Sequence, residues 1–383
     1  MKETWKQLRR YPIVVLFLAF LMGFAVLDEL WPKRDFSELE NRSLAQRPAF
    51  SLDAVFAEKT SDTWMTKYDK YTKDQVAFRD GWINLKSGME TALLKTENNG
   101  VWYGKDRYLF AKQLQIGGRF TMNAGALQKL AQRHPGQVDV MIVPSASLVL
   151  QDKLPAYAPA ADEAACLDEL ARLLEGSANV YDMRPVLAAH PEEELYYRTD
   201  HHWTFQGAYR AYEAYISSKG LAPMDLAGAK IDTVDDFYGT NYSKARRPGT
   251  APDVLQYLDL PNILRVYKLQ RDGTMLEETG PLMDVAALAT RDKYKAFLRG
   301  NNGYSVLEGN GEGSILVVKD SYANSFIPFL TANYQTIGIV DFRDNANKLD
   351  AIMTEGGYDQ VLILYSFSGF STDSNLASRI ATP

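Results

Sequence analysis

Cysteine is scarce in this sequence, and an excess of positive charge is lacking. Cys166 is the only cysteine among the 383 residues, which excludes a disulfide within the chain and a zinc site built from several cysteines. The formal net charge of -6 argues against general affinity for nucleic acid. No repeat of the length typical of solenoid proteins is present. Hydrophobic residues (46%) and charged residues (23%) are at ordinary levels for a globular protein, so the bulk of the chain is expected to fold.

Residues 1–30 carry a membrane signal. The segment from Tyr11 to Leu27 contains no charged residue, and its length lies at the lower limit for crossing a bilayer. The basic residues that precede it are Lys2, Lys6, Arg9 and Arg10. They would stay cytoplasmic and place the remainder outside. Because no small-residue cleavage site follows, an uncleaved single-pass anchor is favoured over a removed signal peptide, and a buried core helix is the third interpretation.

The remainder is interpreted as a connector and one large extracytoplasmic domain. Residues 31–53 are polar, contain Pro48 and are predicted to be a linker. Residues 54–383 are predicted to be the domain, which begins with helical spacing over 54–94. A short hairpin over 101–110 is expected to follow.

From residue 123 onward, short apolar strands alternate with helices. The expected strands are 138–143, 180–181, 315–318, 337–340 and 361–365. The expected helices are 123–134, 162–175, 205–219, 323–332 and 347–355. Near-continuous apolar strands separated by helices indicate an α/β sandwich of three layers, in which helices cover both faces of a mainly parallel sheet. Residues 221–312 do not keep this rhythm, are rich in glycine and proline, and are interpreted as a loop-rich insertion that forms one wall of the functional site.

The stretch from Tyr196 to Thr204, written Y-Y-R-T-D-H-H-W-T, holds two of the four histidines in the chain. A histidine titrates near neutral pH, and a carboxylate two positions away can fix its tautomer and stabilise the imidazolium. His202 is therefore predicted to be a general base and Asp200 its orienting carboxylate. They lie just before an expected helix, for which Thr204 is a possible N-cap.

A nucleophile for this base is expected where the strand at 315–318 runs into the string K-D-S-Y-A-N. A strand that turns sharply into a helix exposes the serine at the turn, which makes Ser321 the candidate, although serine is also a common helix cap there. The neighbouring Asp320 is expected to point elsewhere. The candidate donors to an oxyanion are the amides of Ser321 and Tyr322, together with Gly300 and Asn301.

Two other interpretations of the D-H-H string stay open. Aspartate and adjacent histidines can ligate zinc or manganese. Metallophosphoesterases with such a string add aspartate motifs on preceding strands, which are lacking here, and His134 and His190 do not have ligand spacing, so no metal is expected. The second interpretation is a surface loop that happens to contain two histidines.

The Asp200-His201-His202-Trp203-Thr204 string, the K-D-S-Y-A-N string and Glu40-Asn41-Arg42 resemble the DHHW-motif protein family. These proteins are similar to the alginate O-acetylation proteins, which are SGNH-hydrolase-like with a permuted order in which Asp-x-His precedes Ser. The resemblance runs from about Glu40 to the C-terminus. It implies an extracytoplasmic enzyme without a cofactor that forms an acetyl-serine and passes the acetyl group to a polysaccharide hydroxyl. A multi-spanning membrane acyltransferase is the implied partner.

Under this resemblance Ser321 takes the place of the nucleophile, His202 that of the base and Asp200 that of the orienting residue. Three functions are then to be distinguished. The first is a membrane-anchored O-acetyltransferase that acts on an exopolysaccharide or a cell-envelope glycan. The second is a carbohydrate acetylesterase with the same triad, and the third is a glycan-binding assembly protein without catalysis.

Overall fold

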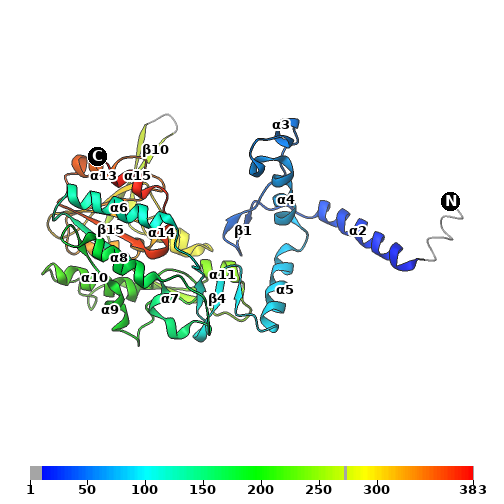
Figure 1. The fold of residues 1–383 in the computed structure, drawn as a ribbon, viewed down its shortest axis with the longest axis horizontal. Coiled ribbons are helices and arrows are strands. Elements are labelled where there is room, and N and C mark those ends of the chain that lie inside the picture. Colours follow the sequence, from blue (N-terminus) through cyan, green and yellow to red (C-terminus); the bar gives the residue numbers. More distant parts are fainter. Residues whose placement is uncertain (1–10, 271–273, 383) are drawn as a thin grey trace. The chain divides into compact units, whose positions relative to one another are not determined.

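The computed structural model describes residues 11–270 and 274–382, which belong to two compact units, Met1–Leu94 and Lys95–Pro383 (Figure 1). The four basic residues on which the predicted topology rests, Lys2, Lys6, Arg9 and Arg10, lie outside the described residues. Each unit has its own set of elements.

The first unit holds a long apolar helix and several short elements. They are α2 (Pro12–Leu30), β1 (Phe36–Ser37), β2 (Arg42–Ser43), α3 (Leu52–Val55), η1 (Thr60–Asp62), α4 (Trp64–Gln75) and α5 (Arg79–Ala92). Helix α2 has a mean hydropathy of 2.4, and none of its residues is buried in the protein. Among the described residues it is the one helix long and apolar enough to cross a bilayer, so it is a candidate membrane anchor.

Residues 31–53, which the sequence predicts to be a linker, carry structure. Strands β1 and β2 pair there in an antiparallel hairpin. Arg42 donates two hydrogen bonds to Asp74 in α4, at 2.9 and 2.6 Å, and Glu40 forms an ion pair with Arg79 at 2.6 Å. The hydrogen bonds from Arg42 outweigh the effect of burial and lower the pKa of Asp74 to about 2. The Glu40-Asn41-Arg42 string therefore joins this hairpin to α4 and α5.

The helical segment expected over 54–94 is also divided. Helix α4 ends at Gln75, and Phe78 adopts the left-handed conformation (φ 59°) before α5 begins. The boundary between the two compact units falls after Leu94 rather than at residue 54. These helices belong to the first unit because their side chains bind within it, as in the packing of Trp64 on Phe50 with ring centroids 5.5 Å apart.

The second unit is a mixed α/β structure. Its strands are β3 (Glu97–Asn98), β4 (Val101–Tyr103), β5 (Leu109–Ala111), β6 (Val138–Val143), β7 (Asn179–Val180), β8 (Ile231–Phe237), β9 (Asp253–Leu258), β10 (Ile263–Leu269), β11 (Met275–Pro281), β12 (Tyr304–Glu308), β13 (Ser314–Lys319), β14 (Thr336–Val340) and β15 (Gln360–Ser366). Its α-helices are α6 (Gly118–Arg133), α7 (Ala146–Val149), α8 (Glu163–Leu174), α9 (Met183–Ala188), α10 (Phe205–Ser218), α11 (Thr240–Ala245), α12 (Ile327–Leu330), α13 (Leu349–Gly356), α14 (Phe367–Thr372) and α15 (Leu376–Ile380). Short 3-10 helices are η2 (Lys105–Arg107), η3 (Gln151–Lys153), η4 (Val285–Ala289), η5 (Lys293–Ala296) and η6 (Ser321–Asn324).

An eight-stranded sheet forms the centre of this unit, in the order β11-β10-β12-β14-β13-β15-β6-β7. Pairing is parallel from β14 to β7 and antiparallel from β11 to β14. The five strands expected from the apolar runs are the five parallel strands, which confirms the mainly parallel sheet. The predicted helices also occur, except that 323–332 divides into η6 and α12.

Both faces of the sheet are covered, as the continuous apolar strands require. On β13, Ile315 and Val317 pack with α9, α10 and α12, whereas Leu316 and Val318 pack with α6, α8 and α13. Successive side chains of a strand point to opposite faces. The sheet therefore lies between two helical layers.

Residues 221–312 are not the loop-rich insertion that the sequence predicts. They contain α11 and five strands, of which β8 and β9 form a separate hairpin while β10, β11 and β12 extend the large sheet. Figure 1 shows β10 at the margin of the unit. The prediction was wrong because these antiparallel strands mix polar with apolar residues, and β11 itself contains Gly280 and Pro281.

Candidate active site

The D-H-H string lies on a loop whose two ends are fixed. Tyr196 and Trp203 form an isolated antiparallel bridge across it. Thr204 accepts a hydrogen bond from the Gly207 amide at 3.2 Å and so begins α10, which confirms the expected N-cap. The loop is thus mounted on a rigid helix.

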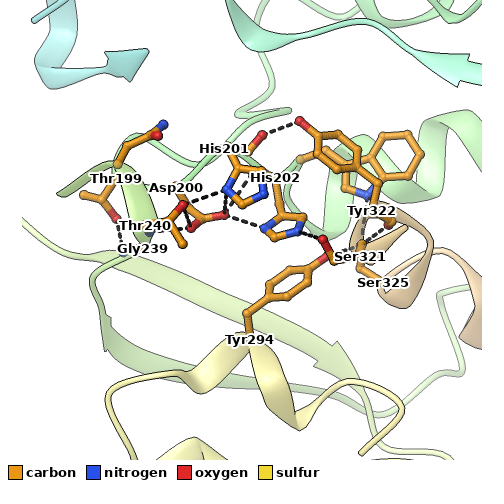
Figure 2. A network of polar contacts seen from close by, with 12 residues as sticks. Thr199, Asp200, His201, His202, Gly239, Thr240, Tyr294, Ser321, Tyr322 and Ser325 are labelled. Atoms are coloured by element: carbon orange, nitrogen blue, oxygen red, sulfur yellow. Dashed lines mark hydrogen bonds and ion pairs between the residues drawn. The ribbon is translucent and has the colours of Figure 1, made fainter. Parts of the chain in front are cut away.

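The structure brings the three predicted side chains into one chain of hydrogen bonds (Figure 2). His202 Nε2 lies 2.8 Å from Ser321 Oγ, although 119 positions separate the two residues. On the other side of the ring, His202 Nδ1 lies 2.5 Å from Asp200 Oδ1. Asp200 and His202 are buried, and Ser321 is partly exposed. An imidazole between a hydroxyl and a carboxylate can take a proton from the hydroxyl while the carboxylate stabilises the resulting cation.

Asp200 is held as an anion. It accepts hydrogen bonds from the His202 amide at 2.9 Å and from the amide and hydroxyl of Thr240 at 2.7 and 3.0 Å. Burial opposes ionisation, but the two neighbouring imidazoles and these hydrogen bonds together hold the pKa of Asp200 well below its usual value. The carboxylate therefore stays charged wherever a histidine titrates.

A second buried carboxylate, that of Asp253, fixes the backbone of the loop just before Asp200. Asp253 accepts hydrogen bonds from the amides of Arg198 and Thr199 at 2.9 and 2.8 Å and from the Thr199 hydroxyl at 2.6 Å. The Thr199 hydroxyl in turn accepts from the Gly239 amide at 2.9 Å. The backbone before Asp200 is therefore tied to β9 and to the start of α11.

Ser321 opens the turn that follows β13. Asp320 caps this turn by accepting from the Tyr322 amide at 2.9 Å, and its other oxygen accepts from the amide and hydroxyl of Ser366 at 3.0 and 2.6 Å. Burial raises the pKa of Asp320, and these hydrogen bonds oppose the rise. As expected, Asp320 does not serve His202: its two oxygens bond Tyr322 and Ser366 and support the turn.

The four candidate oxyanion donors differ in their partners. The Tyr322 amide donates to Asp320, and the Gly300 amide donates to Phe297 O at 3.0 Å, so both are already engaged. The Ser321 amide lies at the first position of its turn, where an amide has no partner within the helix. Asn301 Oδ1 accepts from Lys319 Nζ at 3.2 Å and from Asn324 Nδ2 at 3.1 Å, which leaves the Asn301 amide group to donate. Ser321 and Asn301 remain the candidates that the contacts allow.

Aromatic rings enclose His202 on several sides, and one of them, Tyr294, was not singled out by the sequence. The Tyr294 ring lies parallel to His202, with centroids 3.9 Å apart and planes 12° apart, and Figure 2 shows it beside the Ser321–His202 pair. The His201 ring lies 3.9 Å from His202, and the Tyr322 ring lies 5.2 Å away. Tyr294 and Thr240 come from residues 221–312, so this segment does form a wall of the site. Neither residue belongs to a motif that could have found it.

His201 is turned away from Ser321. Its Nδ1 lies 2.7 Å from Thr240 Oγ1 and 3.5 Å from Asp200 Oδ1. Asp200, His201 and His202 each offer an atom within 4.8 Å of the others, a spacing that a metal ion can bridge. In this structure the same atoms are joined to one another and to Thr240 by hydrogen bonds.

Comparison with known proteins gives one family. The model of the DHHW protein family matches residues 138–340, which is more than half of the chain and includes all three members of the hydrogen-bonded chain. No curated protein sequence is significantly similar to this one.

Solved structures share the fold. A DHHW family protein from Eubacterium siraeum is 20% identical over 75% of this chain and 98% of its own, with a TM-score of 0.64. PatB1 from Bacillus cereus, whose structure contains a sulfonyl adduct, is 16% identical over 73% of this chain and 97% of its own, with a TM-score of 0.58. The O-acetyltransferase domain of Pseudomonas putida AlgJ is 17% identical over 73% of this chain and 95% of its own, with a TM-score of 0.46.

Proposed function

This chain belongs to the DHHW protein family, and we propose that it is a membrane-anchored, SGNH-hydrolase-like O-acetyltransferase that uses Ser321, His202 and Asp200 as a catalytic triad. The observation that supports it most is the His202 ring, which lies within hydrogen-bonding distance of both Ser321 Oγ and Asp200 Oδ1. The acceptor is a hydroxyl of an exopolysaccharide or cell-envelope glycan. The enzyme needs no cofactor.

In the first step Ser321 Oγ attacks the carbonyl carbon of the acetyl donor, and its proton passes to His202 Nε2. Asp200 stabilises the imidazolium. The carbonyl oxygen becomes an oxyanion, which the Ser321 amide and the Asn301 side chain stabilise. When the oxyanion collapses, the bond to the donor group breaks, the donor leaves with the proton from His202, and acetyl-Ser321 remains.

The second step repeats the first with a sugar. A glycan hydroxyl gives its proton to His202 Nε2 and attacks the acetyl carbon. Collapse of the second oxyanion breaks the bond to Ser321 Oγ, which takes the proton back from His202. The product is an O-acetylated glycan, and the enzyme returns to its starting state.

The proposal includes a membrane anchor and a membrane-bound source of acetyl groups. Helix α2 anchors the chain with the second unit outside the cytoplasm, and a multi-spanning membrane acyltransferase delivers the acetyl group. A tether that holds acceptor, donor and enzyme at one surface raises their effective concentrations. The alternative function is an acetylesterase with the same triad, in which water replaces the glycan in the second step.

The first experiment measures cleavage of a chromogenic acetyl ester by the full-length chain. Ser321→Ala is expected to lower turnover by at least about a thousandfold, since the covalent step has no other proposed nucleophile. His202→Ala should cost about as much, and His201→Ala should cost less. Ser374→Ala, at an exposed serine outside the site, is the matched control.

A covalent label tests the same residue without turnover. Because a sulfonyl adduct is present in the PatB1 structure, a sulfonyl fluoride is a suitable reagent, and peptide mass spectrometry locates the modified residue. Modification is expected at Ser321 and should disappear in Ser321→Ala. Modification of another serine in the unaltered chain would refute the assignment.

A further inference from the structure

A cavity of about 300 Å³ is lined by His201, Thr240 and Tyr322, next to the proposed catalytic residues, and the proposed chemistry does not use it. Its polar lining includes Ser147, Ser368, Gln113, Lys244 and His201 itself. Phe110 and Phe367 supply apolar walls. The volume is at the lower end of small-molecule sites, which span roughly 300–1,000 Å³ and combine apolar walls with a few polar groups.

The position of the cavity in the fold is that of a ligand site. Ser147 follows the carboxyl end of β6, and Ser368 follows the carboxyl end of β15. These strands are neighbours in the parallel part of the sheet, and β13, which leads to Ser321, lies on the other side of β15. Ligands of such sheets bind beyond the carboxyl ends of the strands. Because neighbouring strands are about 4.8 Å apart, the cavity lies one or two strand spacings from the position of Ser321.

The tautomer of His201 can be deduced from its neighbours. The single hydroxyl proton of Thr240 is directed to the Asp200 carboxylate, at 3.0 Å, because an ionised acceptor is preferred. Thr240 Oγ1 must then accept from His201 Nδ1, at 2.7 Å, and the Asp200 oxygen 3.5 Å from Nδ1 favours the same proton position. In the neutral ring Nε2 therefore carries a lone pair and can only accept a hydrogen bond.

Gln113 Oε1 is a second acceptor, as the assignment of hydroxyl protons around it shows. The Ser371 hydroxyl donates to Ser368 O at 3.1 Å, so it must accept from Gln113 Nε2 at 3.0 Å. This fixes the orientation of the Gln113 amide and leaves Oε1 as its unbonded end among the described residues. The cavity thus presents these two acceptors, the hydroxyls of Ser147 and Ser368, the ammonium groups of Lys112 and Lys244, and no carboxylate. A ligand that fits must both donate and accept several hydrogen bonds from a compact frame, as a sugar ring does.

We propose that this cavity is a subsite for one sugar ring of the acceptor glycan, held by His201 Nε2 and Gln113 Oε1. The inference rests on the proposed function for its link to acetyl transfer, since a ring bound here places the next sugar of the chain towards Ser321. His201 is then a binding residue, whereas His202 is the base.

The test measures binding rather than turnover. The full-length chain carrying Ser321→Ala is placed in lipid nanodiscs and titrated calorimetrically with hexasaccharides of glucose, of N-acetylglucosamine and of a uronic acid. At least one is expected to bind. Adding Ser368→Trp, which fills the cavity from an exposed position, should weaken binding at least tenfold, whereas Ser374→Trp, at an exposed serine outside the cavity, should not change it.

A second variant, His201→Phe, tests the subsite without introducing a large side chain. His201→Phe retains a ring against His202 but removes the Nε2 acceptor, and the loss of one hydrogen bond of about 1 kcal/mol weakens binding about fivefold. Thermal melting of each variant checks that it is folded. Absence of binding to all three hexasaccharides, or equal binding by the Ser368→Trp variant, would overturn the subsite.

The outcomes for subsite and reaction are separable. If Ser321 were neither labelled nor needed for ester cleavage, the proposed function would fail, while weakened glycan binding in Ser368→Trp would still support the subsite. If Ser368→Trp acetylated the glycan as well as the unaltered chain, the subsite would fail and the transferase would stand.

Discussion

The ring of Tyr294 lies flat against the ring of His202, with centroids 3.9 Å apart and planes 12° apart. The Tyr294 hydroxyl donates to Ser321 O at 3.2 Å and shares a hydrogen bond with Ser325 Oγ at 3.2 Å. Tyr294, in η5, therefore contacts both the proposed base, His202, and the proposed nucleophile, Ser321. It holds the imidazole in plane and keeps water from one of its faces.

Two substitutions separate the ring of Tyr294 from its hydroxyl. Tyr294→Phe keeps the stacked ring and should retain ester cleavage within about threefold. Tyr294→Leu removes the ring face that stabilises the imidazolium, an interaction of roughly 1–2 kcal/mol, so kcat/KM should fall about five- to thirtyfold. Thermal melting distinguishes this effect from unfolding. Equal losses in both variants would mean that the hydroxyl, not the ring, is important.

Gly239 makes a close approach to the orienting carboxylate, and a side chain there cannot be accommodated. A Cβ atom at this position would lie 2.1 Å from Asp200 Cβ and 2.3 Å from Asp200 Oδ2. Gly239→Ala must therefore displace Asp200, and a displacement of about 1 Å in a catalytic group can lower the rate about a hundredfold. Gly228→Ala is the control because no atom lies within 4 Å of its Cβ. Unaltered ester cleavage by Gly239→Ala would contradict the role given to Asp200.

Most of the parallel half of the sheet could be predicted because β6, β13, β14 and β15 are buried on both faces and therefore largely apolar. Strand β6 has the bounds expected for it, and β13 and β15 extend the expected strands by one or two residues. The strands β10 to β12 escaped prediction because their pairing is antiparallel and each mixes polar with apolar residues, most of all the exposed β11. Such a segment has no periodicity strong enough to distinguish it from loops.

The same distinction holds for the site. Asp200, His202 and Ser321 could be proposed because their residue types and local settings imply a proton relay, even though the contact between His202 and Ser321 spans 119 positions. Tyr294 and Thr240 could not, since a tyrosine or threonine outside any recognisable motif has no signature. Their roles depend on where the chain folds back, which only tertiary structure decides.

Glu163 makes stability depend on pH near neutrality. It is 7% exposed, and burial raises its pKa to about 7 although the amide and hydroxyl of Ser145 donate to it. The folded pKa lies above the unfolded value of about 4.3, so the stabilising contribution is complete below that value and is lost as the pH rises to about 7. Relative to Glu163→Gln, which does not titrate, the unaltered chain should lose roughly 3 kcal/mol of unfolding free energy across this range. If the difference in unfolding free energy between the two proteins stayed constant from pH 4 to 8, the predicted role of Glu163 would be disproved.

Removing the candidate anchor should leave a folded, soluble protein. No residue of α2 is buried, so deletion of residues 1–30 exposes no core. The deletion does remove Asp28, whose carboxylate accepts from the Ala77 amide at 2.7 Å, a hydrogen bond that contributes about 0.5–1.5 kcal/mol. Deletion of residues 1–27 retains Asp28 and should melt at a slightly higher temperature. Aggregation of both truncated chains with loss of cooperative melting would show that the helix belongs to the fold.

Sugar hydroxyls are expected to compete successfully with water for the acetyl group on Ser321. Nothing in the three proposed catalytic residues distinguishes the two acceptors, so the preference must come from positioning. A bound glycan presents its hydroxyl at an effective concentration far above its bulk value, and a tether at the membrane adds to this for a polymer made or exported there. Adding acceptor glycan to the full-length chain should therefore raise donor turnover and yield an O-acetylated glycan by mass spectrometry. If saturating glycan left turnover unchanged and all acetyl groups emerged as acetate, the protein would be an esterase.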